Sequence, residues 1–356
     1  MSHKYVLLKE VCEKASSNIA QKDLAECDGI YPIYGASGYI KSVDFFQQAK
    51  DYIAIVKDGA GIGRAMKLPA KSSVIGTMQY VLPKDNINIS YLYYAICSMH
   101  LEKYFSGATI PHIYFRDYQN EQLPLPTLEE QAKIANVFGR IDYFIKKEKE
   151  QLINLDKLVK SRFIELFGDV EESSKRWNTV YLEKVIQSIE SGWSGNGIQR
   201  DKLEGEIAVL KVSAVTKGFF IPSECKVLED QKNIKKYIYP HKDDLLFSRA
   251  NTKEMVGATV IISKDFPELI LPDKLWRIRF NELANIYFIK YVLSSRSIRN
   301  KLSSEATGTS GSMYNISMQK LKQLAIPLPP TDLQNNFAAF VSKIDKSKFV
   351  VTAKFQ

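Results

Sequence analysis

Leu-Pro-Leu-Pro at residues 123–126 is followed by Gln131 and by Ile-Asp at 141–142, and a closely similar series occurs 203 positions later. There, Ile-Pro-Leu-Pro at residues 326–329 is followed by Gln334 and by Ile-Asp at 344–345, with no slip in spacing. A repeat of about two hundred residues is too long for a solenoid unit and indicates a duplicated domain followed by a duplicated helix. The resulting pseudo-two-fold symmetry would suit a ligand with two half-sites, such as duplex DNA.

Composition narrows the class of protein. A chain of 356 residues with 45% hydrophobic content can bury two cores. The net charge of +9 gives mild support to a nucleic-acid ligand. The four cysteines lack C-x-x-C spacing and the four histidines are scattered, so neither a metal site, a cofactor nor a disulfide framework is predicted. Without a signal-like segment or a run of eighteen apolar residues, we expect a soluble, reduced, cytoplasmic protein that does not enter a membrane.

The strongest periodic signal follows the first Pro motif, where seam positions recur at alternating spacings of four and three, as in a coiled coil. The ten seam positions, of which eight are apolar, are Ile134, Phe138, Ile141, Ile145, Glu148, Leu152, Leu155, Val159, Arg162 and Leu166. Thr127 and Glu130 form a capping-box pattern at the start, and Gly168 marks the end. The predicted helix, residues 128–167, would be roughly 60 Å long. An ordinary core helix is the alternative.

The second helix is expected to be shorter. Its seam continues through Val341 and Ile344, but Lys348 interrupts it, so it can pair with part of the long helix only. The seam residues predicted to be left for another protein are Ile145, Leu152, Leu155, Val159 and Leu166. Because residues 128–168 carry eight basic and seven acidic residues, the excess positive charge is expected in the globular domains.

The two globular halves mix β-branched and aromatic runs with turn residues, which is typical of α+β domains. Runs at 52–56, 207–210 and 276–280 are expected strands, and runs at 91–104 and 285–302 are expected helices. The predicted layout is a first domain at 1–126, a spacer helix at 127–168, a second domain at 169–329 and a short helix at 330–356.

A glycine-rich run, KDGAGIGR at residues 57–64, follows a predicted strand. It fits neither G-x-G-x-x-G nor a Walker A motif, so a nucleotide loop is excluded. Two interpretations remain: a tight hairpin that needs positive φ, or a loop that approaches DNA closely while Lys57 and Arg64 reach phosphates or a guanine edge. At the corresponding place in the second half, residues 247–253 supply Arg249 and Lys253 but no glycines.

Hydroxyl-rich loops at 106–113 and 307–316 precede the two Pro motifs. Their amides and hydroxyls could bind phosphate oxygens, although a plain surface loop fits equally well. The candidates in these loops are Thr109, His112, Thr309, Ser310 and Ser312. Trp193, in a Gly/Ser-rich loop at 191–197, could wedge against a base, but burial as a local anchor is the favoured interpretation.

One pattern covers nearly the whole chain. A Pro motif runs into LPTLEEQ at 125–131, a long helix follows and ends in LFGD at 166–169, and the pattern then recurs in tandem. This layout resembles the specificity subunit of type I restriction-modification systems. The resemblance implies two pseudo-symmetric target recognition domains, each reading one half of a split, asymmetric site in double-stranded DNA. The second copy departs from this pattern at one position, because Leu333 stands where the first copy has Glu130.

The resemblance also implies partners. The two helices would pair as an antiparallel coiled coil, set the distance between the half-sites and dock two methyltransferase subunits, which restriction subunits would join. The assembled complex would be an adenine-N6 DNA methyltransferase and an ATP-dependent endonuclease. Self-association of the chain through its apolar stripe is an open alternative.

Catalysis by the chain itself is not expected. It has no Asn/Asp-Pro-Pro-Tyr motif, no Walker A motif and no convincing cluster of nuclease carboxylates. The main rival from another class is a non-catalytic coiled-coil scaffold whose basic domains bind nucleic acid without specificity.

Overall fold

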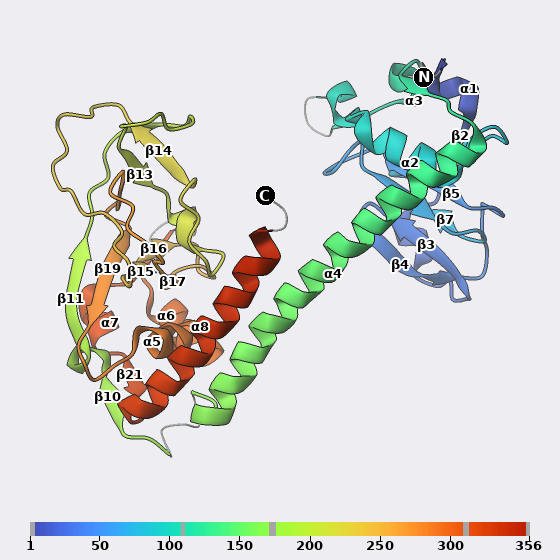
Figure 1. Cartoon of the computed structure of the whole chain (residues 1–356). Helices are drawn as coiled ribbons and strands as arrows, with labels where there is room; N and C mark the ends of the chain where they lie inside the picture. The colour runs from blue at the N-terminus through green and yellow to red at the C-terminus, as the bar shows by residue number, and fades with distance from the viewer. Residues whose placement is uncertain (1–3, 108–110, 171–175, 309–312, 354–356) are drawn as a thin grey trace. The chain divides into compact units, whose positions relative to one another are not determined.

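The computed structural model describes residues 4–107, 111–170, 176–308 and 313–353. The chain forms two compact units, Met1–Lys147 and Glu148–Gln356, and the boundary between them falls within the long helix α4 (Leu128–Phe167) (Figure 1). Each unit has its own sheets and its own hydrophobic core. None of the described helices combines the length and the apolar character needed to cross a membrane.

The first unit contains a four-stranded antiparallel sheet in the order β2-β8-β5-β6, a three-stranded sheet in the order β4-β3-β7, and the pair β1-β9. The strands are β1 (Tyr5–Leu7), β2 (Cys12–Ser16), β3 (Tyr31–Gly35), β4 (Gly38–Val43), β5 (Tyr52–Val56), β6 (Ala65–Leu68), β7 (Ser73–Val74), β8 (Met78–Pro83) and β9 (Gln122–Pro124). Every residue of β5 is buried, because Ile53 and Ile55 belong to one core cluster while Tyr52 and Val56 belong to another. A strand covered on both faces explains the continuous apolar run in its sequence.

Short helices complete the first unit. They are α1 (Leu8–Val11), the 3-10 turns η1 (Gln21–Leu24) and η2 (Leu101–Tyr104), α2 (Ile89–Ser98) and α3 (Phe115–Tyr118). Asn88 caps α2, since its side-chain oxygen accepts hydrogen bonds from the amides of Ser90 and Tyr91. The predicted single helix over 91–104 is wrong, because His100 adopts a left-handed conformation with φ of 52° and interrupts it.

The second unit repeats this architecture. Its sheet order β11-β19-β15-β17 matches β2-β8-β5-β6, and it adds the mixed sheet β12-β14-β13-β18 and the pairs β10-β21 and β16-β20. The strands are β10 (Thr179–Tyr181), β11 (Ile186–Ser191), β12 (Gly197–Ile198), β13 (Ala208–Leu210), β14 (Cys225–Leu228), β15 (Leu245–Ser248), β16 (Ala250–Asn251), β17 (Thr259–Ile261), β18 (Leu269–Ile270), β19 (Leu275–Phe280), β20 (Tyr314–Asn315) and β21 (Ala325–Pro327).

The helical parts of the second unit also match those of the first. They are η4 (Leu182–Lys184), η5 (Val212–Val215), α5 (Ile286–Ser294), α6 (Arg296–Glu305), α7 (Met318–Lys322) and α8 (Thr331–Ala353). Asn285 caps α5 as Asn88 caps α2. The helix predicted over 285–302 is divided into α5 and α6 at Ser295, whose ψ of 150° is extended.

The two Pro motifs form equivalent strands. Leu123 in β9 pairs with Val6 in β1, and Ile326 in β21 pairs with Val180 in β10, both in antiparallel ladders. Each Pro motif therefore ties the start of its domain to its end, immediately before the long helix begins. The duplication inferred from the sequence is confirmed at the level of strand register.

The helix α4 has the predicted bounds. Glu130 accepts a hydrogen bond from the Thr127 amide at 3.0 Å, and its own amide donates to the Thr127 hydroxyl at 3.3 Å, which is the expected capping box. Within the second unit, α8 lies along the last part of α4 (Figure 1). Phe337 near the start of α8 meets Phe167 at the end of α4, whereas Lys348 is 2.6 Å from Asp156, so the two helices are antiparallel.

Candidate nucleic-acid interface and partner-binding helix

In the first unit, two segments that the sequence identified separately lie side by side. The Gly59 amide donates to the Pro111 carbonyl and the Ile113 amide to the Lys57 carbonyl, each at 2.9 Å. Ser106 and His112 exchange two backbone hydrogen bonds of 2.8 Å. Residues 57–64, 106–107 and 111–113 thus form one surface, the first loop pair.

The second unit contains the same arrangement. Strand β16 pairs with β20, and the Ile316 amide donates to the Arg249 carbonyl at 2.9 Å. Thr307 and Asn315 exchange two backbone hydrogen bonds of 2.8 and 3.0 Å. Residues 249–257, 307–308 and 313–316 form the second loop pair. The hydrogen-bond register makes Lys57 equivalent to Arg249, and His112 equivalent to Asn315.

One glycine also recurs, contrary to the expectation from the sequence. The Gly63 amide donates to the Val56 carbonyl and the Gly257 amide to the Ser248 carbonyl, and their φ angles are +80° and +81°. A side chain at Gly63 would stand 2.6 Å from the Glu102 amide nitrogen, so a close backbone approach as well as the turn requires glycine there. Gly257 lies beyond the short run of residues 247–253 compared in the sequence, which is why its correspondence was missed.

Carboxylates hold the candidate cations of the loop pairs. Asp58 lies 3.5 Å from the Lys57 ammonium and 3.1 Å from His112 Nδ1. The Arg249 guanidinium donates to the Asp273 carbonyl oxygen at 2.9 Å and lies 3.6 Å from its carboxylate. Each loop pair therefore presents one partly buried basic side chain that its domain already orients.

The other candidates are placed differently. The Arg64 guanidinium donates to the Ala36 carbonyl of its own domain, whereas Lys253 is exposed. Trp193 packs against Val209, Leu228 and Ile270, as expected for a local anchor. The candidates Thr109, Thr309, Ser310 and Ser312 lie outside the described residues.

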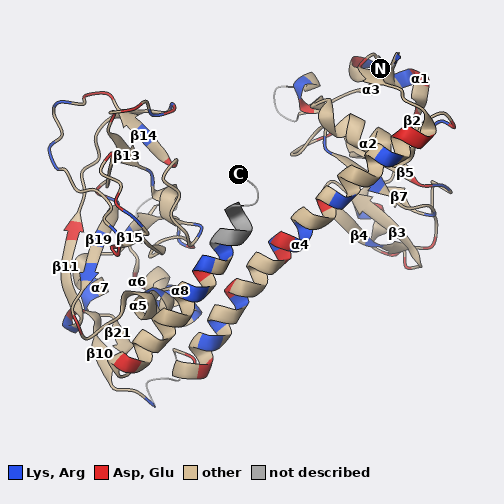
Figure 2. Ribbon diagram, in the orientation of Figure 1, with Lys and Arg blue, Asp and Glu red and all other residues tan. Residues whose placement is uncertain are grey.

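The positive charge is unequally divided, which corrects the simple expectation that both domains hold it. Residues 1–126 contain 13 basic and 12 acidic residues, whereas residues 169–329 contain 24 basic and 19 acidic residues. Both signs are interspersed over each unit (Figure 2). A nucleic-acid surface on the first unit must therefore depend on the local placement of side chains rather than on net charge.

Part of the predicted partner-binding seam is instead buried inside the second unit. Val159 is fully buried, and Leu166 packs against the same core. The ring of Phe163 stacks on that of Phe288 at 5.8 Å and meets that of Phe337 edge-on at 5.4 Å. The expectation that Val159 and Leu166 lack an intrachain partner is wrong, because antiparallel pairing brings the start of α8 to the end of α4. Leu152 and Leu155 are partly buried, as is Ile145 in the first unit.

The exposed apolar stripe lies nearer the start of α4. Val137, Ile141 and Phe144 are 57%, 46% and 57% exposed. At the equivalent positions of α8, Phe340 and Ile344 are partly buried against the core of the second unit. The sequence missed Val137 and Phe144 because they flank the ten seam positions rather than belonging to them, although their spacing of three and four around Ile141 was visible.

A different face of α4 contacts the first domain. The Tyr94 hydroxyl donates to Asp142 at 2.8 Å, and its ring lies 5.0 Å from that of Phe138. Burial and the hydrogen bond to the Asp142 carboxylate raise the pKa of Tyr94 to about 12. The helix is thereby held with one face on its domain and its apolar stripe uncovered within that unit.

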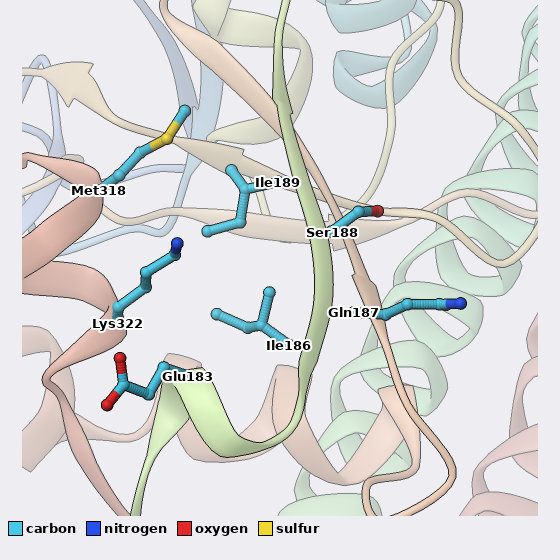
Figure 3. Close-up of a pocket in the computed structure, with 7 residues that line it drawn as sticks. All are labelled: Glu183, Ile186, Gln187, Ser188, Ile189, Met318 and Lys322. Atoms are coloured by element: carbon cyan, nitrogen blue, oxygen red, sulfur yellow. The ribbon is translucent and has the colours of Figure 1, made fainter.

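An open groove of about 570 Å³ lies between β11 and α7 of the second unit (Figure 3). Ile186, Ile189, Met318 and the chain of Lys322 point into it, while Gln187 and Ser188 point to the other side of the strand. Glu183 is its only carboxylate among the lining residues. No group of three or more His, Cys, Asp or Glu side chains suited to a metal ion occurs in the described part of the chain.

A family model described as the type I restriction modification DNA specificity domain matches residues 3–156 and again residues 174–354. The two matched ranges coincide with the two structural repeats and cover most of the chain. The chain belongs to this family. By that description each repeat is a DNA specificity domain, and the curated relatives are specificity subunits, a non-catalytic class of protein.

Individual relatives agree with the family assignment. The chain is 26% identical over 313 residues to the MjaVIII specificity subunit of Methanocaldococcus jannaschii, covering 82% of this chain and 72% of that protein. It is 27% identical over 197 residues to the EcoEI specificity subunit of Escherichia coli, covering 53% of this chain and 33% of that protein. The crystal structure of the type I S subunit from M. genitalium matches 99% of this chain and 92% of that one with a TM-score of 0.59 and 14% identity, a likeness of fold.

Proposed function

We propose that this specificity protein reads a bipartite, asymmetric site in double-stranded DNA, with one target recognition domain on each half-site. The main support is the recurrence of the same loop pair, on the same hydrogen-bonded frame, in both domains. Two copies of one frame with different side chains are suited to two short sequences that differ from each other. Lys57, Arg249, Lys253, His112 and the loops beside them are the candidate contacts.

A binding selection tests this proposal. The chain would be incubated with a pool of random duplexes at fixed salt in the presence of competitor DNA. The expected product is a motif with two defined blocks separated by a spacer of constant length. Unselective binding would instead favour the rival function, a scaffold with nonspecific affinity for nucleic acid.

Exchange of one domain gives a second, independent test. Replacing residues 1–126 with the matching domain of a relative should change one block of the motif and leave the other block and the spacer unchanged. The physical reason is that each domain has its own core and its own loop pair. Alteration of both blocks would contradict the assignment of one domain to each half-site.

We further propose that α4 docks methyltransferase subunits, two for the complete assembly, and that restriction subunits join that core in the cytoplasm. The support is the uncovered apolar stripe of Val137, Ile141 and Phe144, which a partner helix could bury. Ile145, Leu152 and Leu155 remain candidates for the same contact. Pairing of the stripe with a second copy of the chain is the alternative, and sedimentation of the isolated chain distinguishes the two.

A further inference from the structure

The two loop pairs retain the same kind of residue at the positions that build their frame. Lys57 and Arg249 each accept a hydrogen bond through the backbone carbonyl, from Ile113 and Ile316 respectively. Both isoleucines are completely buried. The residues that close the frames, Ser106 and Thr307, both carry a hydroxyl. Frame positions thus conserve charge, shape or hydroxyl chemistry between the two halves.

The side chains differ in chemistry at two equivalent positions of these frames: Asp58 corresponds to Ala250, and His112 corresponds to Asn315. Asp58 bridges to His112 in the first loop pair, whereas Ala250 pairs with Asn315 in the second. The His112 side chain is 36% exposed, with Nδ1 3.1 Å from the Asp58 carboxylate. Asn315 is partly buried, and its side chain forms no hydrogen bond with another residue that the structure describes.

We propose that His112 and Asn315 are the specificity-determining residues of the two loop pairs, each reading a base in its own half-site; this rests on the proposed reading of a bipartite site. A protein that reads two different DNA sequences with two copies of one backbone frame needs different base-contacting side chains in the two copies. Those side chains are expected at positions where the backbones are equivalent but the polar groups differ. Both side chains are short and carry a donor and an acceptor, and a two-stranded ribbon fits the major groove.

The neighbouring residues take distinct roles. Lys57 and Arg249 keep a positive charge at equivalent positions, which suits a phosphate contact made alike in both half-sites. Asp58 is a positioning residue: a carboxylate can only accept, so His112, whose Nδ1 is 3.1 Å away, would donate from Nδ1–H and keep Nε2 for the base. Ala250 offers Asn315 no such partner, so both ends of the amide stay available for an adenine edge.

The test exchanges the two residues within the complete chain. His112→Asn and Asn315→His variants, assembled with methyltransferase subunits, would each select from a pool of random duplexes. His112→Asn is expected to change the preferred base at one position of the first half-site by roughly tenfold or more, and Asn315→His to do so in the second half-site. The spacer and the other half-site should stay as in the parent protein.

Matched controls use the same exchanges outside the loop pairs. His100 in the first unit and Asn300 on α6 are both exposed, so His100→Asn and Asn300→His should leave the selected motif unchanged. Melting temperatures of all variants would be compared, and His112→Gln and Asn315→Gln would replace any variant that does not fold.

The possible results separate the hypotheses. A uniform loss of affinity for all sequences, a change in both half-sites, or an unchanged motif would each overturn the assignment of His112 and Asn315 as specificity residues. If the parent protein itself selects no two-block motif, the proposed function fails, and this inference fails with it. A change confined to one position of the matching half-site supports the assignment.

Discussion

Gln131 and Gln334 occupy equivalent buried sites and make the same three kinds of hydrogen bond. The Gln131 side-chain oxygen accepts from the Asn88 amide at 2.7 Å, and the Gln334 oxygen accepts from the Asn285 amide at 2.8 Å. Their side-chain nitrogens donate to Pro126 and Pro329, respectively, at 2.9 and 2.7 Å, and each also donates to a carbonyl in the turn before the capped helix. Each glutamine thus joins three parts of its unit: the Pro motif, the helix that begins directly after it and the helix capped by asparagine.

Removal of either glutamine should destabilise its own unit. Gln131→Ala leaves the Asn88 amide and two carbonyls without their partner, which should cost about 2–3 kcal/mol in the free energy of unfolding. Gln334→Ala should do the same in the second unit. Urea unfolding would measure the loss, and hydrogen exchange would assign it to a unit. Gln151→Ala, an exposed position on α4, is the control and should change little. An equal loss in all three variants would contradict the proposed role.

The aromatic cluster at the end of α4 gives a second prediction. Phe163→Ala removes a buried ring that contacts Phe288 and Phe337, and should cost about 3–5 kcal/mol in the free energy of unfolding of the second unit. Its chain neighbour Ile164 is 56% exposed and provides the matched control. Ile164→Ala should cost under about 1 kcal/mol. Denaturant midpoints of the two variants would show the difference, and similar values for both would mean that the cluster adds little.

Some of this architecture follows directly from sequence patterns. The bounds of α4 were predictable because a capping box, a sustained heptad seam and a terminal Gly168 all agree. The duplication was predictable because the Pro motif and its glutamine perform the same task twice. By contrast, the breaks at His100 and Ser295 depend on single backbone conformations that no local pattern encodes.

The candidate site was less accessible to sequence reasoning. The sequence identified both segments of each loop pair, but their pairing is a contact between residues 54 positions apart in the first unit and 63 to 65 apart in the second. The equivalence of His112 and Asn315 depends on that register and is invisible without it. The burial of Val159 is different, because it follows from the antiparallel pairing that was expected, which brings the start of α8 to the end of α4.

Two glycines of the first loop pair allow two effects on stability to be measured separately: the strain of a positive φ and the collision of a side chain with a neighbouring backbone. Gly59 and Gly63 both have positive φ, but a side chain at Gly59 would meet open space, whereas one at Gly63 would collide with the backbone of Glu102. Gly59→Ala should therefore cost about 1 kcal/mol in stability, from backbone strain alone. Gly63→Ala should cost more and should increase hydrogen exchange over residues 57–64 and 101–104. Equal costs would mean that the backbone of residues 101–104 yields easily.

Salt dependence distinguishes the two arginines and the lysine of the candidate surface. Lys57→Ala and Arg249→Ala should each reduce the slope of log affinity against log salt by about 0.9, as expected for the loss of one phosphate contact. Arg64→Ala should leave the slope nearly unchanged, because the Arg64 guanidinium is bound to the Ala36 carbonyl and, unlike Lys57 and Arg249, has no cationic counterpart in the other loop pair, where Ala258 takes its place. Titrations of one labelled duplex at several salt concentrations would measure these slopes. A larger effect for Arg64 than for Lys57 would reverse the assignment of the loop's two cations.

The apolar stripe of α4 should decide whether the chain assembles with its partners. Burial of Val137, Ile141 and Phe144 by a partner helix could contribute on the order of 4 kcal/mol, estimated from their apolar area. Changing Ile141 and Phe144 together to Ser should therefore weaken capture of methyltransferase subunits by roughly 100-fold or more while leaving both recognition domains folded. Ile153→Ser and Leu158→Ser, which change exposed apolar residues of α4 outside the stripe, form the control pair. Co-purification and sedimentation of each variant would measure the assembly. Full assembly of the stripe variant with methyltransferase subunits would contradict the docking proposal. If the variant instead lost self-association but still bound methyltransferase subunits, the occupant of the stripe would be a second copy of the chain.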